Sequence, residues 1–121
     1  MEKSIIAQKS FDFALKIIAL YQFLSEQKKE FIMSKQLLRS GTSIGANIRE
    51  SQNAESPMDF VHKLAIAQKE TDETLYWIEL LQQSKYISDE KSQEYIFQCT
   101  EILKILRSII ITKKKNITHN S

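Results

Sequence analysis

The scarcity of residues that break helices constrains this sequence more than any other feature. Its 121 residues include only two glycines and one proline, whereas a protein with many β-strands needs such residues at its turns. Residues that favour helices dominate instead. A chain of this length fits one domain with one continuous core. We therefore expect a single all-α domain that covers residues 1–121.

Apolar residues recur at three- and four-residue steps in four segments, which predicts four amphipathic helices. Short polar links between these segments favour antiparallel neighbours. The sequence thus predicts an antiparallel up-down-up-down four-helix bundle. The expected helices cover about 10–27, 34–54, 57–84 and 89–113, followed by a flexible tail at 116–121.

The pattern of the first helix predicts both its start and its inner face. Ser10 is the expected N-cap, and Asp12 would place a negative charge near the positive end of the helix dipole. Four residues have the spacing of a face that packs into the core: Phe11, Ala14, Ile18 and Tyr21.

The second helix contains both glycines, within a segment, 39–47, that locally resembles a loop. The apolar period that includes Ile44 and Ile48 nevertheless continues through it without a phase break. Gly41 and Gly45 lie four residues apart, on one face, where a neighbouring helix could approach closely. We expect a helix here, because close packing can offset a cost of roughly 1 kcal/mol per glycine.

Candidate catalytic and metal-binding residues are few. His62 and His119 are far apart in the sequence, and neither has a His or Glu partner three or four residues further on. Cys99 lies on the apolar stripe of the fourth helix, where a thiol is buried and unreactive. We expect a protein that is not an enzyme, with no catalytic residue, no metal, no cofactor and no small-molecule substrate.

The sequence also bears on location. It contains no apolar segment of the ~20 residues that a membrane span needs. No N-terminal secretory signal is recognisable, and the single cysteine cannot form an internal disulfide. These features predict a cytoplasmic protein that does not associate with a membrane.

The net charge of +2 is unevenly distributed along the chain. Residues 99–121 carry five basic residues and one acidic residue, a net +4, which leaves residues 1–98 at −2. A terminal basic segment of this kind can contact phosphate groups or an acidic partner. Arg49 and Lys63 are weaker candidates. The candidate nucleic-acid contacts are Lys104, Arg107, Lys113, Lys114 and Lys115.

A row of polar residues lies beside the apolar face of the second helix, at steps of four, four and three residues. One interpretation is a network of hydrogen bonds and ion pairs between helices that determines the register of the bundle. The other is a surface for a ligand or a second subunit. The candidate members are Arg39, Ser43, Asn47 and Glu50, with Glu70 and Glu73 of the third helix as expected partners.

Three segments resemble a known bacterial family: LLRSGTSIGANIRES at 37–51, DFVHKLAIAQKE at 59–70 and ETLYWIELL at 73–81. They are similar to the 23S rRNA intervening-sequence proteins, also called the S23 ribosomal protein family. The resemblance covers nearly the whole chain and implies an antiparallel four-helix bundle. The family is related to the accessory protein of diversity-generating retroelements, so the resemblance also implies a ring-like homopentamer.

Two hypotheses for the function follow. The first is a non-enzymatic oligomer whose assembled surface binds RNA or a nucleoprotein partner. The second is an oligomeric scaffold that binds a protein partner and no nucleic acid. The family name does not decide between them, because it records where some of the genes lie, inside insertions in ribosomal RNA genes. The net acidic character of residues 1–98 argues against strong nonspecific RNA binding.

Overall fold

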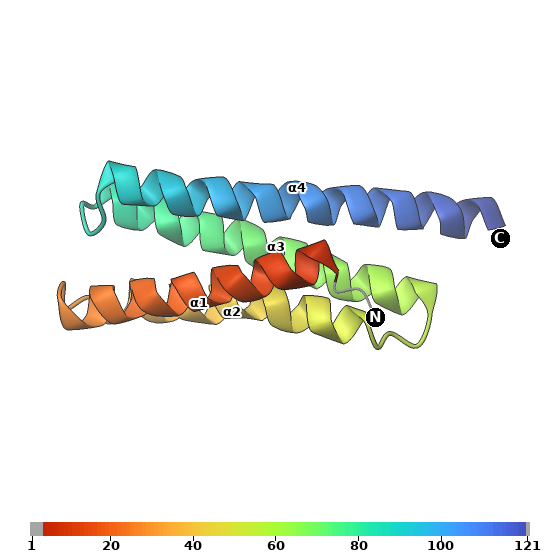
Figure 1. Cartoon of the computed structure of the whole chain (residues 1–121), viewed down its shortest axis with the longest axis horizontal. Coiled ribbons are helices and arrows are strands. Elements are labelled where there is room, and N and C mark those ends of the chain that lie inside the picture. Colours follow the sequence, from red (N-terminus) through yellow and green to blue (C-terminus); the bar gives the residue numbers. More distant parts are fainter. Residues whose placement is uncertain (1–3, 121) are drawn as a thin grey trace.

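A computed structural model describes residues 4–120 of the chain, with side chains up to residue 118. Its helices lie side by side along the long axis of the molecule, and α4 is the longest (Figure 1). The described part of the chain contains no strand, which confirms the predicted all-α class. The elements are α1 (Ile5–Glu26), α2 (Met33–Ser51), α3 (Pro57–Gln83) and α4 (Asp89–Asn120).

Two ion pairs close the bundle between its first and last helices. Lys9 Nζ lies 3.0 Å from Glu101 Oε1, and Lys16 Nζ lies 2.8 Å from Glu94 Oε1. Residue numbers rise along α1 as they fall along α4, so these two helices are antiparallel. The Tyr95 hydroxyl adds a hydrogen bond of 3.0 Å to the Lys16 carbonyl. Together with the three short turns, these contacts confirm the predicted up-down-up-down arrangement.

The start of α1 differs from the prediction. Ser4 is the N-cap, and its Oγ accepts a hydrogen bond of 3.2 Å from the Ala7 N–H. Ser10 lies buried inside the helix, where its hydroxyl donates to the Ala7 carbonyl at 3.1 Å. The expectation that Ser10 caps the helix was wrong because Ile6 already packs into the core. Asp12 is therefore well inside the helix rather than in its first turn.

The inner face of α1 also differs. Phe11 is 50% exposed and Ile18 is 38% exposed, whereas Ala14 and Tyr21 are half-buried. Apolar residues occur on more than one side of α1, so a three-to-four-residue period fits two alternative stripes. Packing against α2 and α4 selects one of them. The stripe that enters the core consists of Ile6, Phe13, Ile17, Leu20 and Leu24.

The glycine segment of α2 is helical, as predicted. A Cβ atom on Gly41 would lie 2.8 Å from two side-chain carbons of Ile17 in α1, closer than real carbon atoms approach. A Cβ on Gly45 would come no nearer than 3.4 Å to Ser10, which is an ordinary contact. The absence of a side chain at Gly41 therefore allows α1 and α2 to pack closely.

A buried carboxylate caps the start of α2. Glu30 Oε1 accepts a hydrogen bond of 2.8 Å from the Ser34 N–H, and its Oε2 accepts from the N–H groups of Ile32 and Met33. These N–H groups have no partner within the helix itself. From the sequence, residues 26–30 were expected to form a short charged link between antiparallel helices. At its other end α2 stops at Ser51, three residues before the predicted position.

The carboxyl end of α4 is longer than predicted. The helix continues to Asn120, so the expectation of a flexible tail is wrong for residues 116–120, and Ser121 lies outside the described residues. The last turns of α4 project beyond the link between α2 and α3 (Figure 1). Ile117 packs against the core from this end of α4, which gives the extension an apolar contact.

Candidate nucleic-acid interface

Four basic side chains extend from the outer surface of α4 toward its carboxyl end. Lys104, Arg107 and Lys114 follow steps of three and seven residues, which places them on one side of the helix. Lys115 lies next to them, and all four are exposed. None of the four forms an ion pair with a carboxylate in the described part of the chain. We call these residues the α4 basic row.

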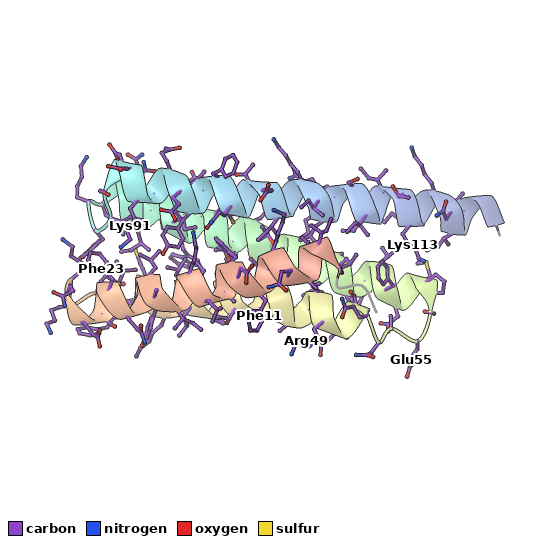
Figure 2. The ribbon with its side chains drawn as sticks, viewed as in Figure 1. Phe11, Phe23, Arg49, Glu55, Lys91 and Lys113 are labelled. Carbon is purple, nitrogen blue, oxygen red and sulfur yellow. The ribbon has the colours of Figure 1, made fainter. Side chains whose placement is uncertain are left out.

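Lys113 does not share this surface. Its Nζ lies 5.3 Å from the centre of the Phe60 ring of α3, and its side chain is half-buried (Figure 2). Each residue of a helix is rotated by about 100° from the one before it, so consecutive lysines point in different directions. The structure thus separates Lys113 from Lys114 and Lys115, although the sequence places them together.

The two weaker candidates come from other helices. Arg49 is exposed in the last turn of α2 (Figure 2). Lys63 is half-buried near the start of α3. Neither residue belongs to the α4 basic row.

The polar residues of α2 and α3 meet at one point on the surface. Arg39 donates hydrogen bonds to Glu70 Oε2 at 3.0 Å and to Glu73 Oε2. The Trp77 indole N–H donates to the same Glu73 oxygen at 3.0 Å. The hydrogen bonds from Trp77 and from Arg39 lower the pKa of Glu73 below its usual value. Conversely, the bond to Glu73 raises the pKa of Arg39.

The other members of this polar row make local contacts. The Ser43 hydroxyl donates to the Arg39 carbonyl at 2.6 Å, and the Asn47 side chain donates to the Ser43 carbonyl at 2.8 Å. Glu50 is exposed and makes no side-chain hydrogen bond within the described residues. Within this polar row, the side-chain contact between α2 and α3 thus consists of Arg39 and its two glutamates. Trp77 joins them, a partner that four-residue spacing from Glu73 could have indicated.

An exposed apolar strip on α1 is a second surface feature. Phe11, Leu15 and Ile18 are 50%, 54% and 38% exposed, and their spacing places them on the side of α1 that faces away from the core. From the sequence we expected two of them, Phe11 and Ile18, to pack into the core. Apolar side chains that share one exposed face of a helix are a feature of surfaces that contact a partner. We call these three residues the α1 strip; Figure 2 labels Phe11.

The described residues include few candidates for a reactive or metal-binding site. Burial raises the pKa of the Cys99 thiol to about 12, and its Sγ lies 3.4 Å from the Thr71 carbonyl oxygen. No group of three potential metal ligands occurs among the described side chains, which include His62 but not that of His119. None of the described helices is long and apolar enough to span a membrane.

Comparisons with known proteins identify the family. No curated protein matches the chain. A crystal structure from Bacteroides thetaiotaomicron VPI-5482, of a protein of unknown function from the S23 ribosomal protein family, is 54% identical with a TM-score of 0.87. The match covers 88% of this chain and 98% of that one. The family model described as 23S rRNA-intervening sequence protein matches residues 2–108. The chain therefore belongs to the 23S rRNA-intervening sequence protein family.

Proposed function

We propose that this protein is a non-enzymatic, cytoplasmic homo-oligomer that binds RNA, either free or within a nucleoprotein. The observation that carries the proposal is the α4 basic row, whose charges are exposed and not neutralised by neighbouring carboxylates in the described residues. Phosphate groups release condensed counterions when such side chains bind them, which supplies most of the affinity for RNA. Lys114 and Lys115 lie beyond the family match, which ends at residue 108.

The α1 strip supports the oligomeric part of the proposal. A second copy of the chain would remove its three apolar side chains from water, and each buried square ångström contributes about 25 cal/mol. The resemblance to ring-forming relatives favours a pentamer. Light scattering at micromolar concentration tests this directly. We expect a mass near five times the 14.1 kDa of one chain, and a mass of one chain would contradict the proposal.

A salt titration of RNA binding tests the α4 basic row. The affinity should fall as the salt concentration rises. For single-stranded RNA, the slope of log affinity against log salt concentration becomes shallower by about 0.7 for each phosphate contact that is removed. The variant Lys104→Ala/Lys114→Ala should therefore lower the slope by about 1.4. Lys35→Ala/Lys69→Ala is the matched control, because it removes two exposed lysines from α2 and α3. Equal effects of both variants would contradict a role for the row.

The alternative is a protein scaffold without nucleic acid. Phe97 and Ile111 favour it, because they are 69% and 54% exposed on the same outer surface of α4 as Lys104. A surface that mixes apolar and basic side chains suits an amphipathic acidic segment of a partner protein. The absence of RNA binding at 50 mM salt, a condition that strengthens phosphate contacts, would support the scaffold and contradict the RNA proposal.

A further inference from the structure

An open pocket lies at the end of the bundle opposite the carboxyl end of α4. The α1–α2 turn and the α3–α4 turn come together at this end (Figure 1). The pocket has a volume of about 400 Å³. It is lined by residues from both turns and the adjoining helices: Phe23, Lys28, Lys85, Tyr86, Ile87, Ser88, Asp89 and Lys91.

The lining is positively charged. It contains three lysines and one carboxylate, that of Asp89. Asp89 Oδ1 already accepts a hydrogen bond of 3.2 Å from the Gln82 side chain. Lys28, Lys85 and Lys91 form no ion pair with any carboxylate in the described part of the chain. Their combined charge is therefore available to an anion in the pocket.

The ring of Phe23 brings two of these charges together. Lys91 Nζ lies 4.2 Å from the ring centroid and Lys28 Nζ lies 5.7 Å from it. Figure 2 shows Lys91 and Phe23 pointing toward one another from α4 and α1. Lys28 lies in the α1–α2 turn and Lys91 near the start of α4, and each ammonium group is attracted to the aromatic ring. An anion in the pocket would be attracted to both ammonium groups.

Lys85 is held at the pocket by an unusual backbone conformation. Its φ of 70° lies in the left-handed region, which glycine and asparagine adopt far more readily than lysine. Lys29, in the other turn, has a φ of 55° but does not line the pocket. This conformation ends α3, because the Tyr86 N–H donates to the Leu81 carbonyl at 2.9 Å, and it places Lys85 at the pocket wall.

We propose that this pocket binds a backbone phosphate of the RNA, with Lys28, Lys85 and Lys91 as its ligands; this inference rests on the proposed function. Ser88 and Asp89, at the start of α4, line the same pocket. Lys91 and Lys114 are 23 positions apart on α4, about 35 Å at 1.5 Å per residue. RNA that contacts both sites would extend along most of the bundle.

The variant Lys85→Asn tests the pocket with little risk to the fold, because asparagine tolerates the left-handed conformation. We expect it to weaken binding of a short oligouridine about threefold to tenfold and to reduce the salt slope by about 0.7. Lys29→Asn is the matched control, since it makes the same substitution in the same conformation away from the pocket lining. It should leave both quantities unchanged. Lys91→Gln should reproduce the effect of Lys85→Asn.

The possible results separate the two proposals. If Lys85→Asn and Lys29→Asn have equal effects on RNA binding, or no effect, the proposal that the pocket binds phosphate is contradicted. RNA binding through the α4 basic row is not affected by that result. If the wild-type protein binds no RNA at low salt, the proposed function itself fails and the pocket's RNA assignment fails with it. In a further arm, inorganic phosphate alone is titrated into isotope-labelled protein. If the NMR chemical shifts of the backbone amides of residues 85–91 change and reach saturation at micromolar phosphate, free phosphate is the ligand. This result would overturn the RNA assignment.

Discussion

Arg39 of α2 and Glu73 of α3 form an ion pair across the surface of the bundle, and Trp77 donates its indole N–H to the same carboxylate oxygen. The contact joins two of the segments that carry the family resemblance, 37–51 and 73–81. Below it, the Thr74 hydroxyl donates to Ser40 Oγ at 2.9 Å in the interior between the same helices. A surface ion pair and a buried hydroxyl pair, one residue apart on each helix, together specify the register of α2 against α3.

The first prediction concerns the pH dependence of stability. The variant Glu73→Gln removes the charge, but its amide oxygen can still accept from Trp77. The folded pKa of Glu73 is depressed, so its stabilising effect is present above the usual value of 4.5 and is lost as pH falls through the lower folded pKa. Because both partners are about a third to a half exposed, we expect a loss of at most about 1 kcal/mol at pH 7. Urea denaturation should show this difference at pH 7 and a smaller one at pH 2, with Glu79→Gln, at an exposed carboxylate of the same helix, as the control.

The second prediction compares the two glycines. Gly41→Ala would force a Cβ against the Ile17 side chain at 2.8 Å. Overpacking of this kind costs roughly 1–3 kcal/mol, which exceeds the gain of about 1 kcal/mol in helix propensity. Gly45→Ala meets only ordinary contacts, so we expect it to be neutral or slightly stabilising. Chemical denaturation of the two variants provides the comparison, and equal stabilities would contradict the close approach of α1 to Gly41.

The third prediction concerns the cap of α2. Glu30→Ala leaves three N–H groups of the first turn without their carboxylate acceptor. We expect a loss of about 1–2 kcal/mol in the free energy of unfolding. Glu26→Ala, at the exposed end of α1, is the control and should change stability by less than about 0.5 kcal/mol. Faster amide exchange at the start of α2 should accompany the loss.

The fourth prediction tests the α1 strip as a surface between copies. Leu15→Glu places a charge at the centre of the strip and should dissociate the oligomer, because an unpaired charge is costly to bury. Light scattering should then report 14.1 kDa. Ala65→Glu introduces the same charge at an exposed position on α3, away from α1, and should leave the mass unchanged. An oligomer that survives Leu15→Glu would place the interface elsewhere.

The fifth prediction concerns Cys99. A buried thiol with a pKa of about 12 has almost no thiolate at pH 8. A thiol-specific reagent should therefore leave the folded protein unmodified and react rapidly after denaturation in urea. Rapid modification of the folded protein at pH 8 would show that α3 and α4 separate readily, because the Sγ lies against the Thr71 carbonyl.

Features that depend on neighbouring residues could be predicted from the sequence. Ser56 caps α3, and its Oγ accepts a hydrogen bond of 3.0 Å from the Asp59 N–H, three residues away. Pro57 follows at the first position of the helix, as expected from its fixed φ. The apolar period that continues across Gly41 and Gly45 likewise predicted the helix that the structure shows there. Local capping and periodicity therefore determined the number, order and class of the helices.

Tertiary structure decided which faces of those helices meet. Phe11 and Phe13 are both apolar and two positions apart, yet only Phe13 is buried. Glu30 looked like part of a solvated link until its carboxylate was seen to cap α2. The pocket between the two turns joins Phe23, Lys85 and Lys91, which are distant in the sequence. A periodic pattern defines a stripe on one helix, but the choice between stripes depends on the burial that all four helices achieve together.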